Sequence, residues 1–162
     1  MARMTTDGMD DFIETLNTLG EKTEAAAKRS LYAGADVLAD ALRAAVLQLP
    51  LDNDPKKPRS GPLRVITTQD REDLANCVGL SRMDSNAEGI NISASFTGYI
   101  GRTEAGYPNG VPAAMIARSI ESGSSVRAKR PFIRRTVNGV KASVSQAMQE
   151  ELDAYINQIQ EE

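Results

Sequence analysis

Serine hydroxyls and carboxylates are the side chains of this sequence that could act as nucleophiles or as general acids and bases. Ser81, Ser93 and Ser95 lie on expected strands, but no G-x-S-x-G turn surrounds them and the chain contains no histidine. A serine–lysine dyad stays formally open, although no S-x-x-K occurs in a suitable setting. The acids of residues 7–14 fall at the expected start of a helix, where the helix dipole favours negative charge. We therefore expect no catalytic residue.

Cys77 is the one cysteine of the chain. A structural zinc site needs four Cys or His ligands, and a disulfide needs a second cysteine, so neither can be built within this chain. We therefore expect no metal, no cofactor and no internal disulfide. Cys77 itself is expected to be a small buried apolar group.

The composition fits one globular domain over residues 1–162, with 41% hydrophobic and 25% charged residues. The formal net charge of -3 argues against a surface built wholly for nucleic acid, and the aromatic content of 4% favours helix packing over an aromatic-rich sandwich. The apolar stretches are short, and residues 1–7 lack the apolar core of a signal peptide. We expect a soluble protein that is not exported by that route and does not contact a membrane.

Charge is unevenly distributed near the C-terminus. Residues 127–135 are rich in Lys and Arg and contain no acid, whereas acids dominate residues 150–162. Helix stability does not explain this order, because acids stabilise the start of a helix and bases its end. One interpretation is head-to-tail self-association, in which the basic loop of one copy meets the acidic tail of the next and a ring forms. The other interpretation is that both segments are solvated and have no partner, and charge alone slightly favours this second interpretation.

Apolar spacing predicts a long helix over residues 9–49. An apolar stripe runs from Leu31 to Leu49 at alternating spacings of four and three, and charged residues fall on the other side. Gly20 offers a break or a kink, so two helices in line are the alternative, and Pro50 ends the helix. Residues 50–70 contain most of the prolines and predict a flexible loop.

The middle of the chain changes period. After a short helical turn capped near Thr68, residues 74–97 predict a β-hairpin region, because two stretches of alternating apolar residues flank a turn. The side chains expected to face the core together are those of Ile90, Ile92, Ala94 and Phe96.

Gly98 to Pro112 contains several glycines without a phosphate-binding motif, and we expect an irregular surface loop there. Residues 112–122 predict a short helix with an inner face made by Ala113, Ile116, Ala117 and Ile120. The C-terminal helix is expected over residues 136–160, with a start that is weakened by Gly139. The expected fold class is α+β, with a long N-terminal helix and a C-terminal helix packed on a small antiparallel sheet.

Two stretches near the C-terminus resemble one known family. Ile116–Ser125 contains the form I-A-x-x-x-E-x-G-[TS] over residues 116–124, and Arg130–Val137, together with the residue before it, has the form x-x-P-F-[IL]-R-x-[AT]-[VL], with a short basic spacer between the two stretches. This pair resembles the C-terminal block of the phage tail-component family, the small neck or tail-completion proteins of long-tailed bacteriophages and prophages. Residues 78–83 and 96–99 are similar to the family's central strands, and the helix expected over 9–49 to its N-terminal helix.

The motif residues also have physical roles of their own. We expect Gly123 to allow an αL end of the short helix, Pro131 to set an extended entry, and Phe132 to anchor the loop by burying its ring. Arg135 departs from the pattern, because many relatives carry an apolar residue or proline there. The residues expected at an interface are Arg118, Glu121, Arg127, Lys129, Arg130, Phe132, Arg134, Arg135, Glu150, Glu151 and Asp153.

The resemblance implies a non-enzymatic structural protein of the virion, located at the head-to-tail junction and in the host cytoplasm during assembly. It implies a homo-oligomeric ring, sixfold by symmetry with the tail, through which DNA passes. The implied partners are connector or head-closure proteins on one side and a tail terminator or tail tube protein on the other. A tail terminator of the same junction is the alternative within this class.

Two hypotheses from other classes remain. A nucleic-acid-binding module would use the basic residues of 56–64 and 127–135, and its affinity would fall steeply with salt because binding releases counterions. A carboxylate-dependent hydrolase would show metal-stimulated activity, but no motif supports it.

Overall fold

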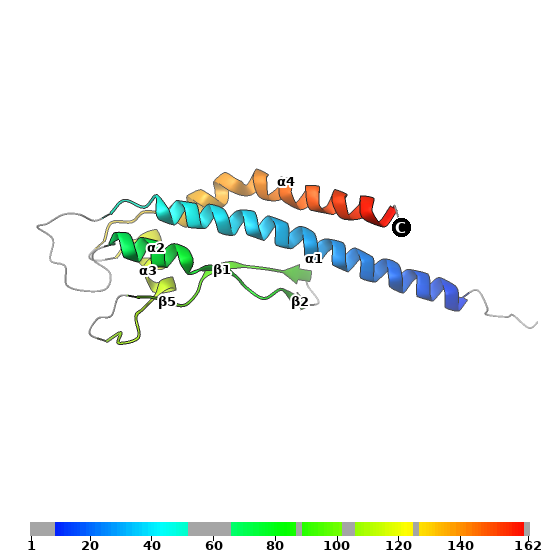
Figure 1. Cartoon of the computed structure of the whole chain (residues 1–162), viewed down its shortest axis with the longest axis horizontal. Coiled ribbons are helices and arrows are strands. Elements are labelled where there is room, and N and C mark those ends of the chain that lie inside the picture. Colours follow the sequence, from blue (N-terminus) through cyan, green and yellow to red (C-terminus); the bar gives the residue numbers. More distant parts are fainter. Residues whose placement is uncertain (1–8, 52–65, 87–88, 102–105, 125–126, 161–162) are drawn as a thin grey trace, which may run out of the picture.

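Two long helices lie side by side and run in opposite directions (Figure 1). The structure, a computed structural model, describes residues 9–51, 66–86, 89–101, 106–124 and 127–160, and of residues 9–19, 86 and 160 it describes the backbone alone. Helix α1 spans Met9–Leu47 and helix α4 spans Phe132–Gln160. The start of α4 therefore lies beside the end of α1, and the first turns of α1 extend past the end of α4 (Figure 1).

Helix α1 confirms the predicted N-terminal helix. It continues through Gly20, so the alternative of two helices in line is wrong, and it ends at Leu47 rather than at residue 49. A tightened turn follows, in which the Leu49 N–H donates to the Val46 carbonyl at 3.0 Å. The helical segment ends before Pro50.

Helix α4 begins at Phe132, four residues before the predicted start at residue 136. Gly139 is accommodated inside the helix, which shows that its weak helix propensity does not decide where α4 begins. Where the two long helices pack, Gly34 lets them approach closely, because a Cβ there would lie 2.6 Å from Met148 Cγ.

Two shorter helices complete the helical part. Helix α2 spans Thr68–Asn76 and is held by a capping box, in which Asp70 N–H donates to Thr67 Oγ1 and Thr67 N–H donates to Asp70 Oδ2, both at 3.0 Å. The prediction of a loop over residues 50–70 is therefore wrong for residues 68–70, which belong to α2. Residues 52–65 lie outside the described ranges. Helix α3 spans Ala113–Ser122, and its predicted inner face is buried as expected.

The predicted hairpin is confirmed as two paired stretches of one ribbon. Strand β1 (Val78–Leu80) pairs with β4 (Ala94–Phe96), and β2 (Asp84–Asn86) pairs with β3 (Gly89–Asn91), both antiparallel. Between them the Ser81 N–H donates to the Ser93 carbonyl at 2.7 Å. Ala94 and Phe96 pack against the core as predicted, whereas Ile90 and Ile92 are half-buried and belong to neither core cluster.

The expectation of an irregular surface loop after Gly98 is wrong at both of its ends. Strand β5 (Tyr99–Ile100) pairs with β6 (Val111–Pro112), and the side chains of Ile100 and Val111 are fully buried. Gly110, with φ +97°, makes this pairing feasible, because a Cβ there would lie 2.4 Å from the Ile100 carbonyl oxygen. The many glycines suggested a loop, but one of them serves a close backbone approach.

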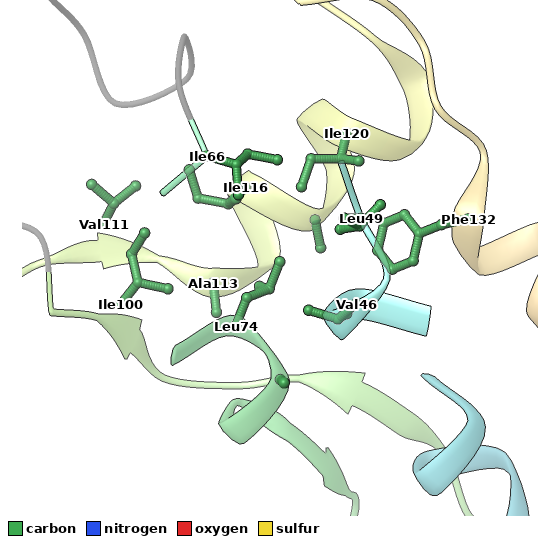
Figure 2. Packing of buried hydrophobic residues seen from close by; sticks show 12 residues of the cluster. Val46, Leu49, Ile66, Leu74, Ile100, Val111, Ala113, Ile116, Ile120 and Phe132 are labelled. Atoms are coloured by element: carbon green, nitrogen blue, oxygen red, sulfur yellow. The ribbon is translucent and has the colours of Figure 1, made fainter. Parts of the chain in front are cut away.

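The main core lies where α1 ends, between α2, α3 and the start of α4 (Figure 2). It consists of Val46, Leu49, Ile66, Leu74, Ala75, Ile100, Val111, Ala113, Ile116, Ala117, Ile120 and Phe132. A smaller cluster of Ala39, Leu42 and Val78 joins α1 to β1. The Phe96 and Phe132 rings meet edge to face with centroids 6.0 Å apart, which connects the ribbon to α4.

This arrangement confirms the predicted α+β class. Long helices at both ends of the chain pack with short antiparallel ribbons in the described ranges. No helix among the described residues combines the length and the apolarity needed to cross a membrane.

Candidate functional site

The junction between α3 and α4 is built by a carboxylate that caps a helix from a distance. Glu121, at the end of α3, accepts hydrogen bonds from the backbone N–H groups of Ile133 (2.8 Å) and Arg134 (3.2 Å). These are N–H groups of the first turn of α4, which have no partner within the helix, and a negative charge there is also favoured by the helix dipole. Glu121 was expected at an interface, but it is half-buried and stabilises this junction instead.

Gly123 ends α3 with a positive φ, as expected, but not in the αL region. Its φ of +78° and ψ of 170° fall in a region that is essentially restricted to glycine. A Cβ at this position would also lie 3.0 Å from the Lys129 backbone nitrogen. The residue therefore lets the chain double back, and the Arg130 N–H donates to the Ile120 carbonyl at 2.8 Å.

Phe132 confirms the expected anchor. Its ring is 8% exposed and belongs to the main core, where it meets Phe96. It was also expected to contribute to an interface, but in the single chain its burial leaves little surface for a partner. Pro131 precedes it and is half-buried.

The cations of residues 127–135 do not share one environment. Arg127 was expected at an interface, but it is 7% exposed and its Nη1 lies 3.4 Å from Ser119 Oγ. Arg130 is half-buried, and its Nη1 donates to the Pro50 carbonyl at 3.3 Å. Lys129, Arg134 and Arg135 are exposed as predicted. The basic surface is thus smaller than the sequence suggested, because Arg127 is folded inward.

A pocket of about 450 Å³ opens between the end of α1 and the start of α4. We call it the basic pocket, because three cations and otherwise neutral side chains line it. Its lining residues are Ala45, Gln48, Leu49, Pro50, Lys129, Arg130, Pro131, Phe132, Arg135 and Thr136. The contribution of α1 was not predicted, since residues 45–50 are distant in sequence and carry no functional motif.

The acids expected at an interface lie on the opposite half of α4 and differ in their contacts. Glu151 forms an ion pair with Arg29 of α1, at 2.8 Å between Oε1 and Nε, and the Arg29 guanidinium also stacks 4.9 Å from the centre of the Tyr155 ring. Glu150 and Asp153 are exposed, and Glu150 accepts from Gln146 of the same helix at 2.8 Å.

Two further predicted residues lie away from this region. Arg118 is exposed on α3, as an interface residue should be. Cys77 is half-buried rather than buried, with its Sγ 3.8 Å from the Tyr99 carbonyl oxygen. Burial, and to a smaller extent the nearby Asp73 carboxylate, raise the pKa of its thiol, which keeps the thiol protonated near neutral pH.

Two further candidate sites are a metal site and the basic segment 56–64. Within the described ranges, no group of three or more Cys, Asp or Glu side chains is placed to hold a metal ion. The cations Lys56, Lys57, Arg59 and Arg64 lie outside those ranges. The remaining candidate site is therefore the basic pocket, together with the exposed half of α4.

Comparisons with protein-family models, with curated proteins and with solved structures gave no significant match to the chain.

Proposed function

We propose that this protein is a structural subunit of the head-to-tail connection of a long-tailed phage, a neck or tail-completion protein that assembles into a homo-oligomeric ring. The observation that carries the proposal is the bond between the two halves of the motif. Glu121 of the E-x-G-S half holds the N–H groups of Ile133 and Arg134 in the P-F-I-R half. This contact gives a physical reason for the two halves to occur together, which supports the resemblance to the tail-component family.

The surroundings of α4 support self-association. Beyond Phe132, none of the described side chains of α4 is fully buried, although the helix has 29 residues. Helix α4 carries the exposed apolar side chains Leu152 and Ile156, and exposed apolar surface of this kind is available to further copies or partners. The basic start of α4 and its acidic later half lie at opposite ends of the helix. The basic end of one copy can therefore contact the acidic end of the next, which is a contact between unlike surfaces.

Within this proposal the ring is sixfold and lies between connector or head-closure proteins and a tail terminator or tail tube protein, with DNA passing through it. The protein acts in the virion and in the host cytoplasm during assembly, and it has no enzymatic role. A tail terminator at the same junction is the alternative role.

A nucleic-acid-binding module is the second candidate function. The observation in its favour is that Lys129, Arg134 and Arg135 are exposed near one end of α4. Its test is duplex DNA binding as a function of salt, since affinity carried by phosphate contacts falls steeply as salt rises. Absence of binding at low salt would exclude this candidate.

The test of the leading proposal is deletion of the gene from the phage or prophage that encodes it. Electron microscopy of the lysate should reveal filled heads and separate tails, and expression of the intact gene from a plasmid should restore joined particles. Normal infectious particles from the deletion strain would overturn the proposal.

A further inference from the structure

The basic pocket combines an apolar floor with a cationic rim. Leu49 and Phe132 belong to the main core at its base, Pro50 and Pro131 add rigid apolar surface, and Lys129 and Arg135 are exposed. Such a lining suits an occupant that carries both apolar side chains and carboxylates.

One face of α4, in its later half, has this chemistry. Leu152 and Ile156 are four residues apart and therefore neighbours on the helix surface, and they are 36% and 42% exposed. Asp153 is three residues before Ile156 and therefore lies next to it on the helix surface, where it is exposed. Exposed large apolar side chains next to a carboxylate form a surface complementary to the basic pocket.

The two surfaces cannot meet within one chain. Arg135 and Asp153 lie on the same straight helix, about 27 Å apart along its axis at 1.5 Å per residue. Contact between them therefore needs two copies, and it joins unlike surfaces of the two. A contact of this kind forms a ring when the rotation between copies closes.

We propose that the basic pocket receives the face of α4 made by Leu152, Asp153 and Ile156 from a second copy of this chain. The inference deepens the proposed function and rests on its self-association part. Leu152 and Ile156 lie against the apolar surface of Pro50 and Pro131, and the Asp153 carboxylate lies against Lys129 and Arg135. Glu151 stays with Arg29 of its own chain and takes no part.

A second copy fits the pocket better than a nucleic acid does. Phe132, the aromatic ring of the pocket lining, is 8% exposed and has no free face on which a base could stack. The apolar side chains of the pocket form no ion pair with a phosphate backbone. The net charge of the whole chain, -3, also disfavours binding to a polyanion.

The test is charge reversal on each side, measured by sedimentation velocity of the full chain over a range of concentrations. Arg135→Glu alone and Asp153→Arg alone should each weaken self-association by at least about tenfold, because an attraction becomes a repulsion. An equal mixture of the two variants should recover association, since it allows one native contact and one reversed contact. A chain carrying both changes should recover it as well.

The matched controls are Arg82→Glu and Asp84→Arg, which reverse exposed charges on the hairpin, away from both surfaces. They should associate like the wild type. Circular dichroism and thermal unfolding check that each variant is folded, and the milder pair Arg135→Gln and Asp153→Asn replaces any variant that is not.

Each other outcome overturns the inference in a distinguishable way. Wild-type assembly that the single reversals leave unchanged would place the subunit contact elsewhere, and the ring would stand. A wild-type chain that stays monomeric would remove the self-association as well, whereas the head-to-tail role is judged separately by the deletion phenotype. Loss of duplex DNA binding in Arg135→Glu, with association unchanged, would assign the pocket to nucleic acid.

Discussion

The two ends of the α1–α4 pair differ in what surrounds them. At the end that holds the start of α4, the helices are embedded with α2, α3 and the short strands in the main core (Figures 1 and 2). Toward the other end, the two helices pack mainly on each other, through contacts that include those of Gly34 with Met148, of Ser30 with the Met148 carbonyl and of Arg29 with Glu151 and Tyr155. We call these the packed end and the two-helix end.

Stability is expected to reside at the packed end, and assembly at the two-helix end. The free energy of folding comes mainly from burial of apolar side chains, and the largest fully buried ones lie at the packed end. The two-helix end contributes little to that burial, and its exposed Leu152 and Ile156 are available to a partner. Substitutions should therefore separate the two ends, with effects on folding at one and on association at the other.

The largest effect is expected in the main core. Ile120→Ala removes a side chain that is 0% exposed and should lower the free energy of unfolding by roughly 2–5 kcal/mol, because it leaves a cavity. Urea denaturation followed by circular dichroism measures the change. The matched substitution at the two-helix end, Ile156→Ala, should cost less than about 1 kcal/mol, and equal costs at the two positions would contradict the comparison.

The next effect concerns the cap of α4. Glu121→Ala leaves the Ile133 and Arg134 N–H groups without their acceptor and should cost about 1–2 kcal/mol. Glu121→Gln keeps an acceptor oxygen but loses the charge, so its cost should be intermediate in the same denaturation experiment. A Glu121→Ala variant as stable as the wild type would show that the carboxylate does not hold the junction.

Two glycines of α1 provide a sharper test of the helix contact. Gly20 has open space around its Cα, so Gly20→Ala should stabilise the chain by up to about 1 kcal/mol through helix propensity. Gly34→Ala gains the same propensity, but its Cβ would overlap Met148 and force that side chain to move. We expect the Gly34 variant to unfold at a lower temperature than the Gly20 variant. The reverse order would mean that the helices are not closely packed at Met148.

The smallest effect is expected for the surface ion pair of the two-helix end. The Arg29 and Glu151 side chains are 49% and 31% exposed, so Arg29→Ala should cost only about 0.3–1 kcal/mol. Part of that cost should disappear in high salt, which screens exposed charges. A loss comparable to that of Ile120→Ala would mean that this pair, rather than apolar burial, holds the helices together.

The elements that depend on local periodicity could be predicted from the sequence. The apolar stripe of α1 and the inner face of α3 follow from spacings of three and four, and the ribbon follows from alternation around a turn. These patterns need only the residues of one segment, which is why they were recognisable.

The features that were missed depend on contacts between distant segments. The start of α4 at Phe132 is stabilised by Glu121 of another helix, and the burial of Arg127 depends on α3. The pairing of Ile100 with Val111 needs a close approach at Gly110. No local pattern reports such contacts, and for the same reason the α1 side of the basic pocket could not be foreseen.

We propose that the exposed half of α4 and the basic pocket make this chain a ring-forming subunit. Native mass spectrometry of the full wild-type chain tests it most directly. We predict one closed assembly, six copies of the 17.5 kDa chain, whose stoichiometry does not change with protein concentration. A monomer at every concentration, or an open series of masses that grows with concentration, would contradict the account.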